Sequence, residues 1–366
     1  MGASIKIRNF TEGDDEQIVE LLQNVFNSWP KFDIESSPLD YWKWKYSRSY
    51  GRSVTVVAED GGKIIGAYHS VPCKFKLYDG YYHASLGADI AIRPDYQGIG
   101  LYDKMRELVH QSRIQHGVDL HYAINENPKL IEKRRKDNRI NPEMYPRFPH
   151  KLTRYIRIKD IGRYLDENPV ENELVKKIGY KVLKKLSEST TVKNVGDKNY
   201  DVIKVNKYEE YIGEYWNQYK DRYNFIFNKD EEFLKWRYFD NRSSKYGVIA
   251  IREEEKLIGY CVMKINTDKD KKQGYITELL ATNQGALDQL MRRSLEYFDE
   301  CDVNLVLALA LPNPTYASCY RSNGFIPYNK YDIDLTLYNT IPSFQRDLRQ
   351  VNVDEAYFSY GDLDYV

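Results

Sequence analysis

Two glycines separated by one residue stand in the stretch RPDYQGIGLYDKM, residues 93–105. The residues before them, HASLGADIAI, alternate small and β-branched side chains, which predicts a strand that ends at Pro94. The residues after them place four apolar side chains on one face of a predicted helix: Leu101, Met105, Leu108 and Val109. The N–H groups of a first helical turn lack intrahelical partners and carry the positive end of the helix dipole. Because glycines let an anion approach these groups closely, the junction is a predicted phosphate-type binding site.

Two familiar phosphate-binding motifs do not match this loop. No further glycine follows Gly100 at the spacing of GxGxxG, and the Gly-Lys-Ser/Thr ending of a P-loop is missing. The loop instead resembles the acyl-CoA signature of the GNAT (Gcn5-related) N-acetyltransferases, which is written Gln/Arg-x-x-Gly-x-Gly/Ala. In this chain the signature reads Gln97, Gly98, Ile99, Gly100, Leu101, Tyr102, so that a tyrosine replaces the usual small final residue.

The resemblance implies that the chain binds an acyl-CoA as co-substrate, with acetyl-CoA as the expected donor, and that it uses no metal. The strand before the turn would offer backbone groups to the pantetheine arm through Ile90, Ala91 and Ile92. Residues 97–102 would hold the diphosphate. Asn127 matches the asparagine that the family often has at the next strand-to-helix junction, and it would complete the cofactor site.

The chain also contains an internal repeat. Segments 41–68 and 233–261 each carry an aromatic-Trp-basic-Tyr cluster, two strand-like runs and an Ile-Gly-aromatic ending. The matched anchors are Trp44 with Trp236, Gly66 with Gly259, and Asn127-Pro128 with Asn313-Pro314. Because three anchors recur in the same order at a nearly constant spacing, the sequence indicates two copies of one unit.

The predicted fold class is therefore α/β, with two GNAT-like units, each a mixed and mostly antiparallel sheet flanked by helices. Residues 1–158 are the predicted N-terminal unit with the acyl-CoA loop, and 159–199 a linker with an amphipathic helix. Residues 200–340 are the predicted degenerate C-terminal unit, and 341–366 a tail that could pack or be loose. The linker helix is basic, and packing on its own domain is the commoner role for such a helix than facing a membrane or partner.

The two copies differ in what they keep. Where the glycine pair should stand, the second copy has only Gly285. It does keep the family's Tyr-x-x-x-Gly-Phe ending at Tyr320, whereas the first copy has Arg134 at that place. In much of the family this tyrosine protonates the departing thiolate, so the first copy must use another residue or solvent. Tyr320 itself is more readily explained as a packing residue or relic.

The implied reaction moves an acyl group from a thioester to a neutral amine, which requires a base or a water chain. Asp89, just before the pantetheine segment, and Glu126, beside Asn127, are the candidate catalytic carboxylates. A structural role for Asp89 and a solvated loop position for Glu126 are the competing interpretations. His69 and His121 lie on predicted strands, where a lone histidine is more often packed than catalytic.

Two further features have both a structural and a functional interpretation. Trp42, Trp44 and Trp236 belong to clusters that occur in both copies, which favours packing over substrate stacking. A dense basic run covers Lys133, Arg134, Arg135, Lys136 and Arg139. It could be a solvated helix face or could meet the phosphates of the donor or an anionic acceptor.

These observations favour an acyl-CoA-dependent N-acyltransferase that acts on a small amine, such as an amino sugar or an amino-acid derivative. Two alternatives remain. One is an aminoacyl transferase of the FemABX type, which also has two GNAT-like halves but usually carries a long helical hairpin. The other is a non-catalytic tandem protein that senses CoA or binds a protein. Binding of CoA without turnover would identify the latter.

The composition excludes several other classes. Lys and Arg total 54 and so do Asp and Glu, so no basic surplus supports a nucleic-acid partner. No apolar run approaches the roughly 18 residues of a membrane span, and the first residues lack a signal-peptide pattern. The four cysteines form no CxxC pair and the six histidines show no metal spacing. We therefore expect a cytoplasmic protein without metal, in which two units in one chain are compatible with a monomer.

Overall fold

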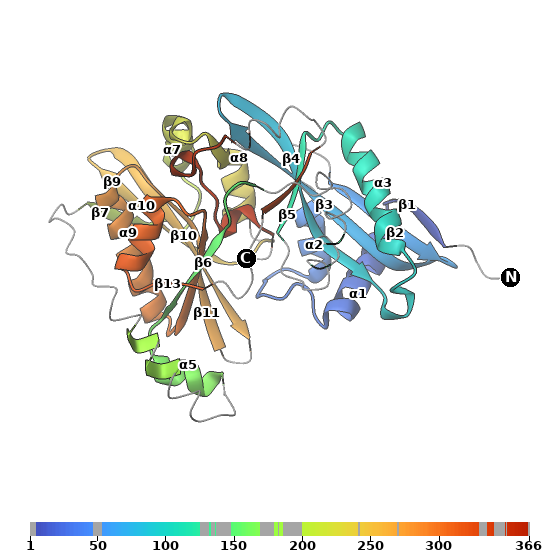
Figure 1. The fold of residues 1–366 in the computed structure, drawn as a ribbon, viewed down its shortest axis with the longest axis horizontal. Helices are drawn as coiled ribbons and strands as arrows, with labels where there is room; N and C mark the ends of the chain where they lie inside the picture. The colour runs from blue at the N-terminus through green and yellow to red at the C-terminus, as the bar shows by residue number, and fades with distance from the viewer. Residues whose placement is uncertain are drawn as a thin grey trace.

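The computed structural model describes two sheets that lie side by side, each of seven strands (Figure 1). The described residues are 5–46, 53–124, 132, 136, 148–168, 179–181, 183–185, 200–240, 242–268, 271–328, 335–339, 348 and 350–364. Both sheets are mixed, mostly antiparallel and flanked by helices. The predicted α/β fold class is confirmed.

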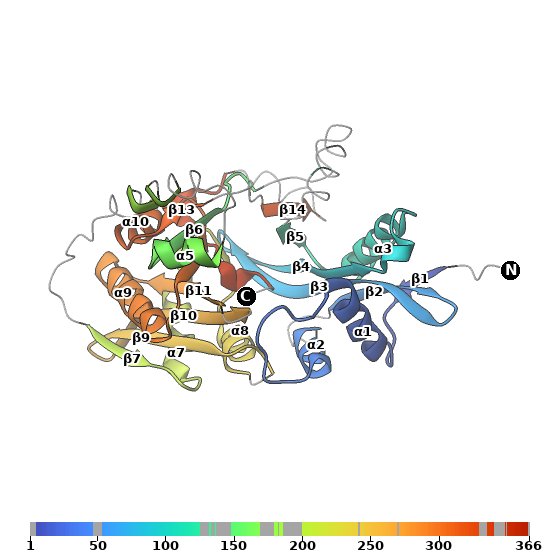
Figure 2. The same cartoon turned by 90° about the horizontal axis from the view of Figure 1, so that it is seen from below.

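The first sheet has helices on both faces. Its strands are β1 (Lys6–Asn9), β2 (Val54–Asp60), β3 (Lys63–Leu77), β4 (Gly80–Ile92), β5 (Leu120–Ile124), β14 (Leu335–Asn339) and β8 (Phe225–Phe227), the last paired with β3. Helices α1 (Asp15–Phe26) and α2 (Pro38–Tyr46) cover one face, and α3 (Leu101–Gln115) covers the other (Figure 2). Alternation along β2 explains this, because Val54 and Val56 pack under α3 while Val57 faces the α1 side.

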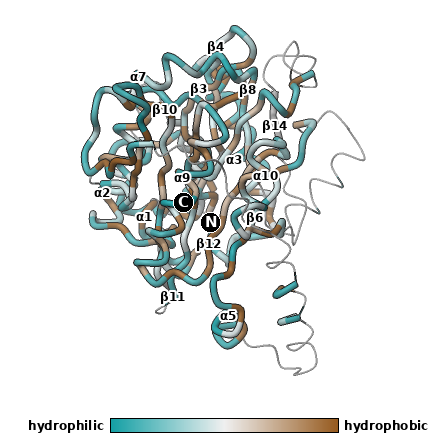
Figure 3. The backbone as a smooth tube through the Cα atoms, turned by 90° about the vertical axis from the view of Figure 1, so that its left-hand side faces the viewer, coloured by the Kyte–Doolittle hydropathy of each residue, from teal (hydrophilic) through white to brown (hydrophobic). Residues whose placement is uncertain are grey.

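The second sheet repeats this plan. Its order is β13 (Ile326–Pro327), β6 (Thr153–Ile158), β12 (Leu305–Ala310), β11 (Lys271–Ala281), β10 (Lys256–Asp268), β9 (Tyr246–Glu253) and β7 (Asp201–Lys204). Around it lie α5 (Ile161–Glu167), α7 (Glu210–Tyr219), α8 (Glu231–Leu234), the π-turn η3 (Lys235–Phe239), α9 (Gln284–Glu300) and α10 (Pro314–Ser322). Figure 3 shows apolar positions concentrated along the inner strands and polar positions on the outer loops.

Each sheet contains a strand that the sequence places in or next to the segment of the other unit. Strand β6 pairs with β12 in the second sheet, although it precedes residue 159. Strand β14 pairs with β5 in the first sheet, although it lies near residue 340. The predicted segments 1–158, 159–199, 200–340 and 341–366 therefore do not each contain one sheet, and as domain boundaries they stay predictions.

The repeated tryptophans meet at the contact between the two units. Trp44 and Trp236 stack with ring centroids 4.6 Å apart and planes 13° apart. Each indole N–H donates to the backbone carbonyl of the other residue at 3.2 Å. Equivalent residues of the repeat thus pack on one another in a reciprocal way. The geometry supports the packing role expected for them.

The end of the chain packs between the sheets. We call residues 351–364 the tail; it contains the short turns η4 (Val353–Glu355) and η5 (Tyr360–Asp362). Tyr357, Phe358, Tyr360 and Leu363 are all at most 4% exposed. The backbone N–H of Tyr357 donates to the carbonyl of Phe225 in β8 at 2.9 Å. Of the two alternatives for this acidic, aromatic segment, packing is the one observed for its described part.

One buried lysine on β10 has an unfavourable environment. Lys264 is 1% exposed, and among the described residues its Nζ has no hydrogen-bond partner and lies 3.5 Å from the centre of the Phe32 ring. Burial lowers the pKa of Lys264 well below 10.5. Folding therefore disfavours the charged form that the unfolded chain holds, which costs stability at neutral pH.

Replacing Lys264→Met is expected to raise the free energy of unfolding by about 1–3 kcal/mol at pH 7, because it keeps the packing and removes the buried amine. The unfolded lysine holds its proton up to its pKa near 10.5, so wild-type stability rises with pH in that range. The difference in the free energy of unfolding between the variant and wild type should therefore decrease from pH 7 to pH 9. Urea unfolding at both pH values checks this, and a variant less stable than wild type would contradict it.

Candidate functional site

The glycine turn forms an open helix N-terminus on the first unit. Gly98 and Gly100 both have φ near +82°, a conformation that side-chain-bearing residues rarely adopt. Gly100 is the residue before α3, and no side chain caps the helix there. A Cβ atom at either glycine would have nothing within 4 Å. Gln97 donates from Nε2 to the carbonyl of Ile92 at 3.0 Å, which ties the loop to the end of β4.

Strands β4 and β5 separate just before this turn. They pair in parallel only over Ala84–Leu86, opposite Leu120–Tyr122. From Gly87 onward β4 keeps β3 on one side, and β5 no longer pairs with it on the other. The predicted pantetheine segment, Ile90 to Ile92, lies on this free length of β4. The predicted loop and strand residues are therefore continuous along one path that leads from α3 back to Leu86.

Asp89 lies at an irregularity in the same strand. Its φ is +41°, and the register between β3 and β4 shifts between Ala67 and His69, opposite it. The Asp89 carboxylate accepts from Lys45 Nζ at 2.6 Å and from Tyr46 Oη at 2.5 Å, both on α2. Burial opposes ionisation of Asp89, but the Lys45 ammonium, the neighbouring His69 and the hydrogen bonds from Lys45 and Tyr46 together outweigh burial and hold the pKa of Asp89 below its usual range.

His69 beside Asp89 has both ring nitrogens engaged. Trp42 donates from Nε1 to His69 Nε2 at 3.1 Å. The other nitrogen, Nδ1, lies 3.0 Å from the backbone carbonyl of Asp89 and must carry the hydrogen. Burial lowers the pKa of His69 to about 4. A neutral, fully hydrogen-bonded histidine is a packing residue, as expected for a lone histidine on a strand. We call Asp89, Lys45, Tyr46, His69 and Trp42 the Asp89 cluster.

The tail adds a carboxylate to this cluster. Asp364 accepts from Lys45 Nζ at 3.1 Å, so one ammonium lies between Asp89 and Asp364. Burial disfavours the charge of Lys45, but the two carboxylates raise the pKa of Lys45 above its ordinary value. Sequence reasoning missed both Lys45 and Asp364. A signal existed for Lys45, because a basic residue follows the tryptophan in both copies; none existed for Asp364.

A narrow cavity opens where β4 and β5 separate, between the two units. It encloses about 450 Å³ including its open mouth, of which about 30 Å³ can hold the centre of a water-sized atom. We call it the inner cavity. Its walls come from both units and the tail: Lys45, Val71, Cys73, Lys74, Leu86, Tyr122, Phe227, Asn228, Phe233, Trp236, Arg237, Gly361, Asp362, Leu363 and Asp364. Its size suits a small chemical group.

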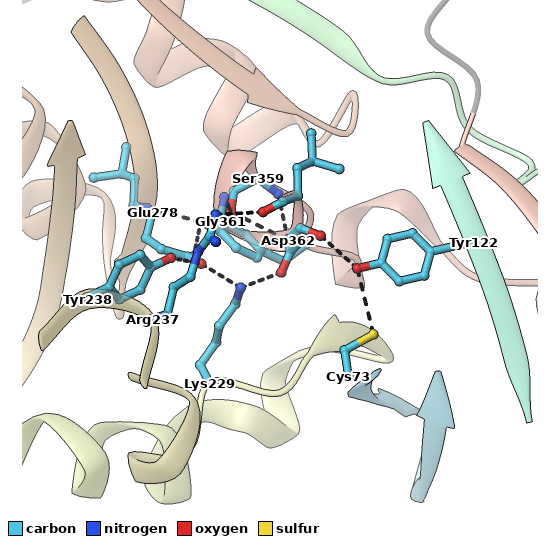
Figure 4. A network of polar contacts seen from close by, with 12 residues as sticks. Cys73, Tyr122, Lys229, Arg237, Tyr238, Glu278, Ser359, Gly361 and Asp362 are labelled. Carbon is cyan, nitrogen blue, oxygen red and sulfur yellow. Dashed lines mark hydrogen bonds and ion pairs between the residues drawn. The ribbon is translucent and has the colours of Figure 1, made fainter. Parts of the chain in front are cut away.

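A second polar cluster supports the tail wall of the inner cavity (Figure 4). Lys229 donates to Glu278 of β11 at 2.6 Å and to Asp362 of the tail. Tyr238 donates to Glu278 at 2.8 Å, and Tyr357 donates to it at 3.2 Å. We call these five residues the Lys229 cluster. Tyr122 of the first unit donates to the carbonyl of Asp362 at 2.7 Å, and Arg237 donates to that of Leu363 at 2.7 Å.

The remaining predicted residues divide into two groups. Glu126, Asn127, Arg134 and most of the basic run lie outside the described residues. His121 is buried and its Nδ1 lies 2.8 Å from the carbonyl of Ser85. Tyr320 is buried in the second unit, where it stacks on Tyr155 at 4.8 Å, far from the glycine turn in sequence and on the other sheet. Both contacts agree with packing roles.

The described part of the chain has neither a metal-binding cluster nor a helix that could span a membrane. No group of three or more His, Cys, Asp or Glu side chains there could hold a metal ion. None of the described helices is long and apolar enough to cross a membrane.

Comparison with known proteins agrees with this geometry. Residues 6–129 match the family model of the acetyltransferase (GNAT) domain. No curated protein matches the sequence significantly. Three solved structures share the fold over most of the chain. A probable N-acyltransferase from Enterococcus faecalis V583 has a TM-score of 0.59 and 12% identity, covering 92% of this chain and 72% of that one.

The other two structures are similarly distant in sequence. A GCN5-related N-acetyltransferase from Anabaena variabilis has a TM-score of 0.58 and 10% identity, covering 91% and 72% of the two chains. Saccharomyces cerevisiae N-myristoyltransferase with bound myristoyl-CoA has a TM-score of 0.60 and 10% identity, covering 92% and 83%. At these identities the likeness is one of fold. The chain therefore carries a GNAT domain over residues 6–129 within a GNAT-type fold.

Proposed function

We propose that the chain is an acyl-CoA-dependent N-acyltransferase that transfers an acyl group, with acetyl as the first choice, to the amine of a small molecule such as an amino sugar or an amino-acid derivative. The observation that carries this proposal is the order of three features along the chain: Leu86 on the wall of the inner cavity, then the length of β4 beside which β5 no longer pairs, then the N-terminus of α3, which no side chain caps among the described residues. An acyl group, a pantetheine arm and a diphosphate need such sites in that order.

The donor is proposed to lie along this path. Residues 97–102 would bind the diphosphate through backbone N–H groups, and Ile90, Ala91 and Ile92 would bind the pantetheine arm. Asn127 is kept in the proposed cofactor site on the family resemblance. The yeast N-myristoyltransferase of similar fold has myristoyl-CoA bound, which supports an acyl-CoA as co-substrate. The small volume of the inner cavity favours a short acyl group over a long one.

The acceptor is proposed to enter the inner cavity from the face opposite α3. Its nitrogen would attack the thioester carbonyl carbon, so that a C–N bond forms, the C–S bond breaks and CoA leaves as a thiolate. The amine gives up one proton and the thiolate takes one from solvent. Asp89 was the predicted base, but its contacts with Lys45 and Tyr46 favour a positioning role. Glu126 stays a prediction.

Asp364 is proposed as the proton acceptor, because it lines the inner cavity and Asp89 does not, although both carboxylates accept from Lys45. It lies on the wall of the inner cavity, and its side chain is 17% exposed, whereas the neighbouring Asp362 is fully buried. An ionised carboxylate there would attract a protonated amine and then accept its proton, directly or through water. Lys45, held by Asp89, would keep Asp364 in place.

Calorimetric titration with acetyl-CoA tests the proposed donor. Binding of one acetyl-CoA per chain is expected, with weaker binding of myristoyl-CoA because of the small cavity. A screen of amino sugars and amino acids for release of CoA thiol then tests transfer. Binding without turnover on any amine would favour a non-catalytic CoA-binding protein, and absence of binding would overturn the acetyl-CoA donor.

Replacing Asp364→Asn is expected to lower kcat for the amine by about 100-fold, because the proton acceptor is lost while water can still take the proton slowly. The affinity for acetyl-CoA should not change. Steady-state kinetics and the acetyl-CoA titration measure the two quantities. Asp354→Asn, in the same tail but outside the cavity wall, is the matched control. An unchanged kcat in Asp364→Asn would exclude this role.

A further inference from the structure

The second unit contains a counterpart of the Asp89 site. Gly66 pairs with Ile92 and the matching Gly259 pairs with Ala281. Asp89 and Glu278 each stand three positions before those partners. Tyr46, two residues after Trp44, donates to Asp89, and Tyr238, two residues after Trp236, donates to Glu278. The two carboxylates therefore occupy equivalent places in the two sheets.

The second unit also has the same separation of strands. Strands β11 and β12 pair in parallel only over Gln273–Ile276, and from Thr277 onward β12 no longer pairs with β11. In the first unit, β3 is the only described strand that pairs with the equivalent length of β4. In the second unit the tail occupies this place: the backbone N–H of Leu279 donates to Tyr357 Oη at 3.0 Å. Leu279 stands directly after Glu278, just as Ile90 stands after Asp89.

The N-termini of the equivalent helices α3 and α9 also differ, because a side chain of the chain itself caps α9. The first turn of α3 has no side-chain cap. The first turn of α9 is capped by Asn283, whose side chain accepts from the N–H of Ala286 at 2.9 Å. An acyl-CoA could bind the second unit at the helix N-terminus and at the strand edge. At both places a side chain of the chain itself already accepts a hydrogen bond from a backbone N–H group.

We propose that the tail is a built-in occupant of the second unit's cleft, and that its anchoring there positions the wall of the inner cavity in the first unit. Two nearby tail residues face the two sites. Asp362 joins Lys229 and Glu278 in the second unit, and Asp364 joins Lys45 in the first. The chain consequently has one donor site, and Lys229, Glu278 and Tyr357 act as positioning residues for Asp364. The link to catalysis rests on the proposed function.

Tyr357→Phe tests the anchoring with little risk to the fold, because only one hydroxyl is removed. It leaves the N–H of Leu279 without its acceptor, so we expect hydrogen exchange of the tail amides, measured by mass spectrometry, to rise about tenfold. Tyr316→Phe is the matched control, since the Tyr316 hydroxyl is also buried in the second unit, and its hydrogen-bond partner among the described residues is the Tyr223 hydroxyl at 3.1 Å rather than a tail group. The substitution keeps the ring that lies 5.2 Å from the ring of Tyr357. If the tail amides exchanged hydrogen at the same rate in Tyr357→Phe, Tyr316→Phe and wild type, the proposed anchoring of the tail would be overturned.

The single donor site is tested by the stoichiometry of acetyl-CoA. Wild type and Tyr357→Phe should both bind one equivalent through the glycine turn, because the α9 N-terminus remains capped. A second equivalent on wild type would overturn the inference while leaving the acyl-CoA function intact. If wild type bound none, the proposed donor would fail, and the exchange experiment would still decide whether the tail is anchored in the second unit.

With an acceptor identified, the kinetics of Tyr357→Phe separate positioning from general loosening. Displacement of Asp364 should raise the acceptor KM and lower kcat together, by about tenfold in kcat/KM, without changing the affinity for acetyl-CoA. The Tyr316→Phe control should match wild type. Unchanged acceptor kinetics in a variant whose tail exchange had risen would contradict the link between tail anchoring and the inner cavity.

Discussion

Replacing Lys229→Met is expected to lower the free energy of unfolding by about 3–5 kcal/mol, because it leaves two buried carboxylates without their cation. Lys229, Glu278 and Asp362 have side chains at most 1% exposed, so water cannot take the place of the ammonium. Denaturant unfolding monitored by circular dichroism measures the change. An unfolding midpoint equal to that of wild type would show that this cluster does not hold the tail.

The effect should depend on pH in a defined direction. Burial raises the pKa of Asp362 to about 6, although Lys229 draws it down. The folded state therefore holds a proton on Asp362 that the unfolded state releases at lower pH, so this contribution to stability is present at low pH and lost as the pH rises through about 6. The stability deficit of Lys229→Met should therefore be smaller at pH 5, below the pKa of Asp362, than at pH 8, where Asp362 is charged.

A nearby lysine provides the control. Lys235, on the turn that follows α8, forms an ion pair with Glu231, and both side chains are about half exposed. Lys235→Met should change stability little, since exposed pairs contribute little. The double variant Lys229→Met with Asp362→Asn should recover part of the loss, because it removes one of the stranded charges. If the double variant were no more stable than Lys229→Met, the lost stability would be due to packing of the aliphatic part of the lysine side chain.

Replacing Gly100→Trp is expected to weaken acetyl-CoA binding by about 1,000-fold. A φ of +82° strains any side-chain-bearing residue, and the indole would cover the N–H groups of the first turn of α3. Loss of two or three charge-assisted hydrogen bonds to a diphosphate corresponds to an effect of this order. Calorimetric titration of wild type and variant measures it.

The other end of the same helix supplies a matched variant. Gly117 has a φ of +68° and, like Gly100, open space around a Cβ atom. Gly117→Trp should therefore cost similar stability while leaving acetyl-CoA binding intact. Equal affinities of the two variants would place the donor elsewhere on the chain.

Local patterns in the sequence predicted local structure well. The glycine turn, the strand before it and the helix after it depend on residues close in the chain, so composition and spacing suffice to predict them. The internal repeat predicted a shared packing role for the tryptophans. The stacking of Trp44 on Trp236 agrees with that role, although the repeat did not predict that the two would contact each other. The similarity of the two copies also predicted the fold class, since both sheets repeat one plan.

Contacts between distant segments could not be predicted. Lys45 and Asp364 lie 319 positions apart, and no spacing rule relates them. The sequence of the tail indicates only an acidic and aromatic segment, whereas in the structure the tail supplies a wall of the inner cavity. Asp89 lies on β4 beside the predicted pantetheine segment, and its catalytic role stays a prediction. Its partners Lys45 and Tyr46 come from another element, α2, and no local pattern relates them to Asp89. The pairings of β6 with β12 and of β14 with β5 likewise could not be predicted from local sequence patterns.

The exchanged strands have a consequence for synthesis on the ribosome. The first sheet needs β8 and β14, and β14 lies at Leu335–Asn339. The first half of the chain therefore emerges with incomplete sheet edges, which stay open until residues 335–339 have been made. Pairings over such long sequence separations form slowly, and open edges invite association with other chains. Successful folding in the cell should therefore depend on protection of the nascent first half, and slowing translation between the two halves should increase aggregation.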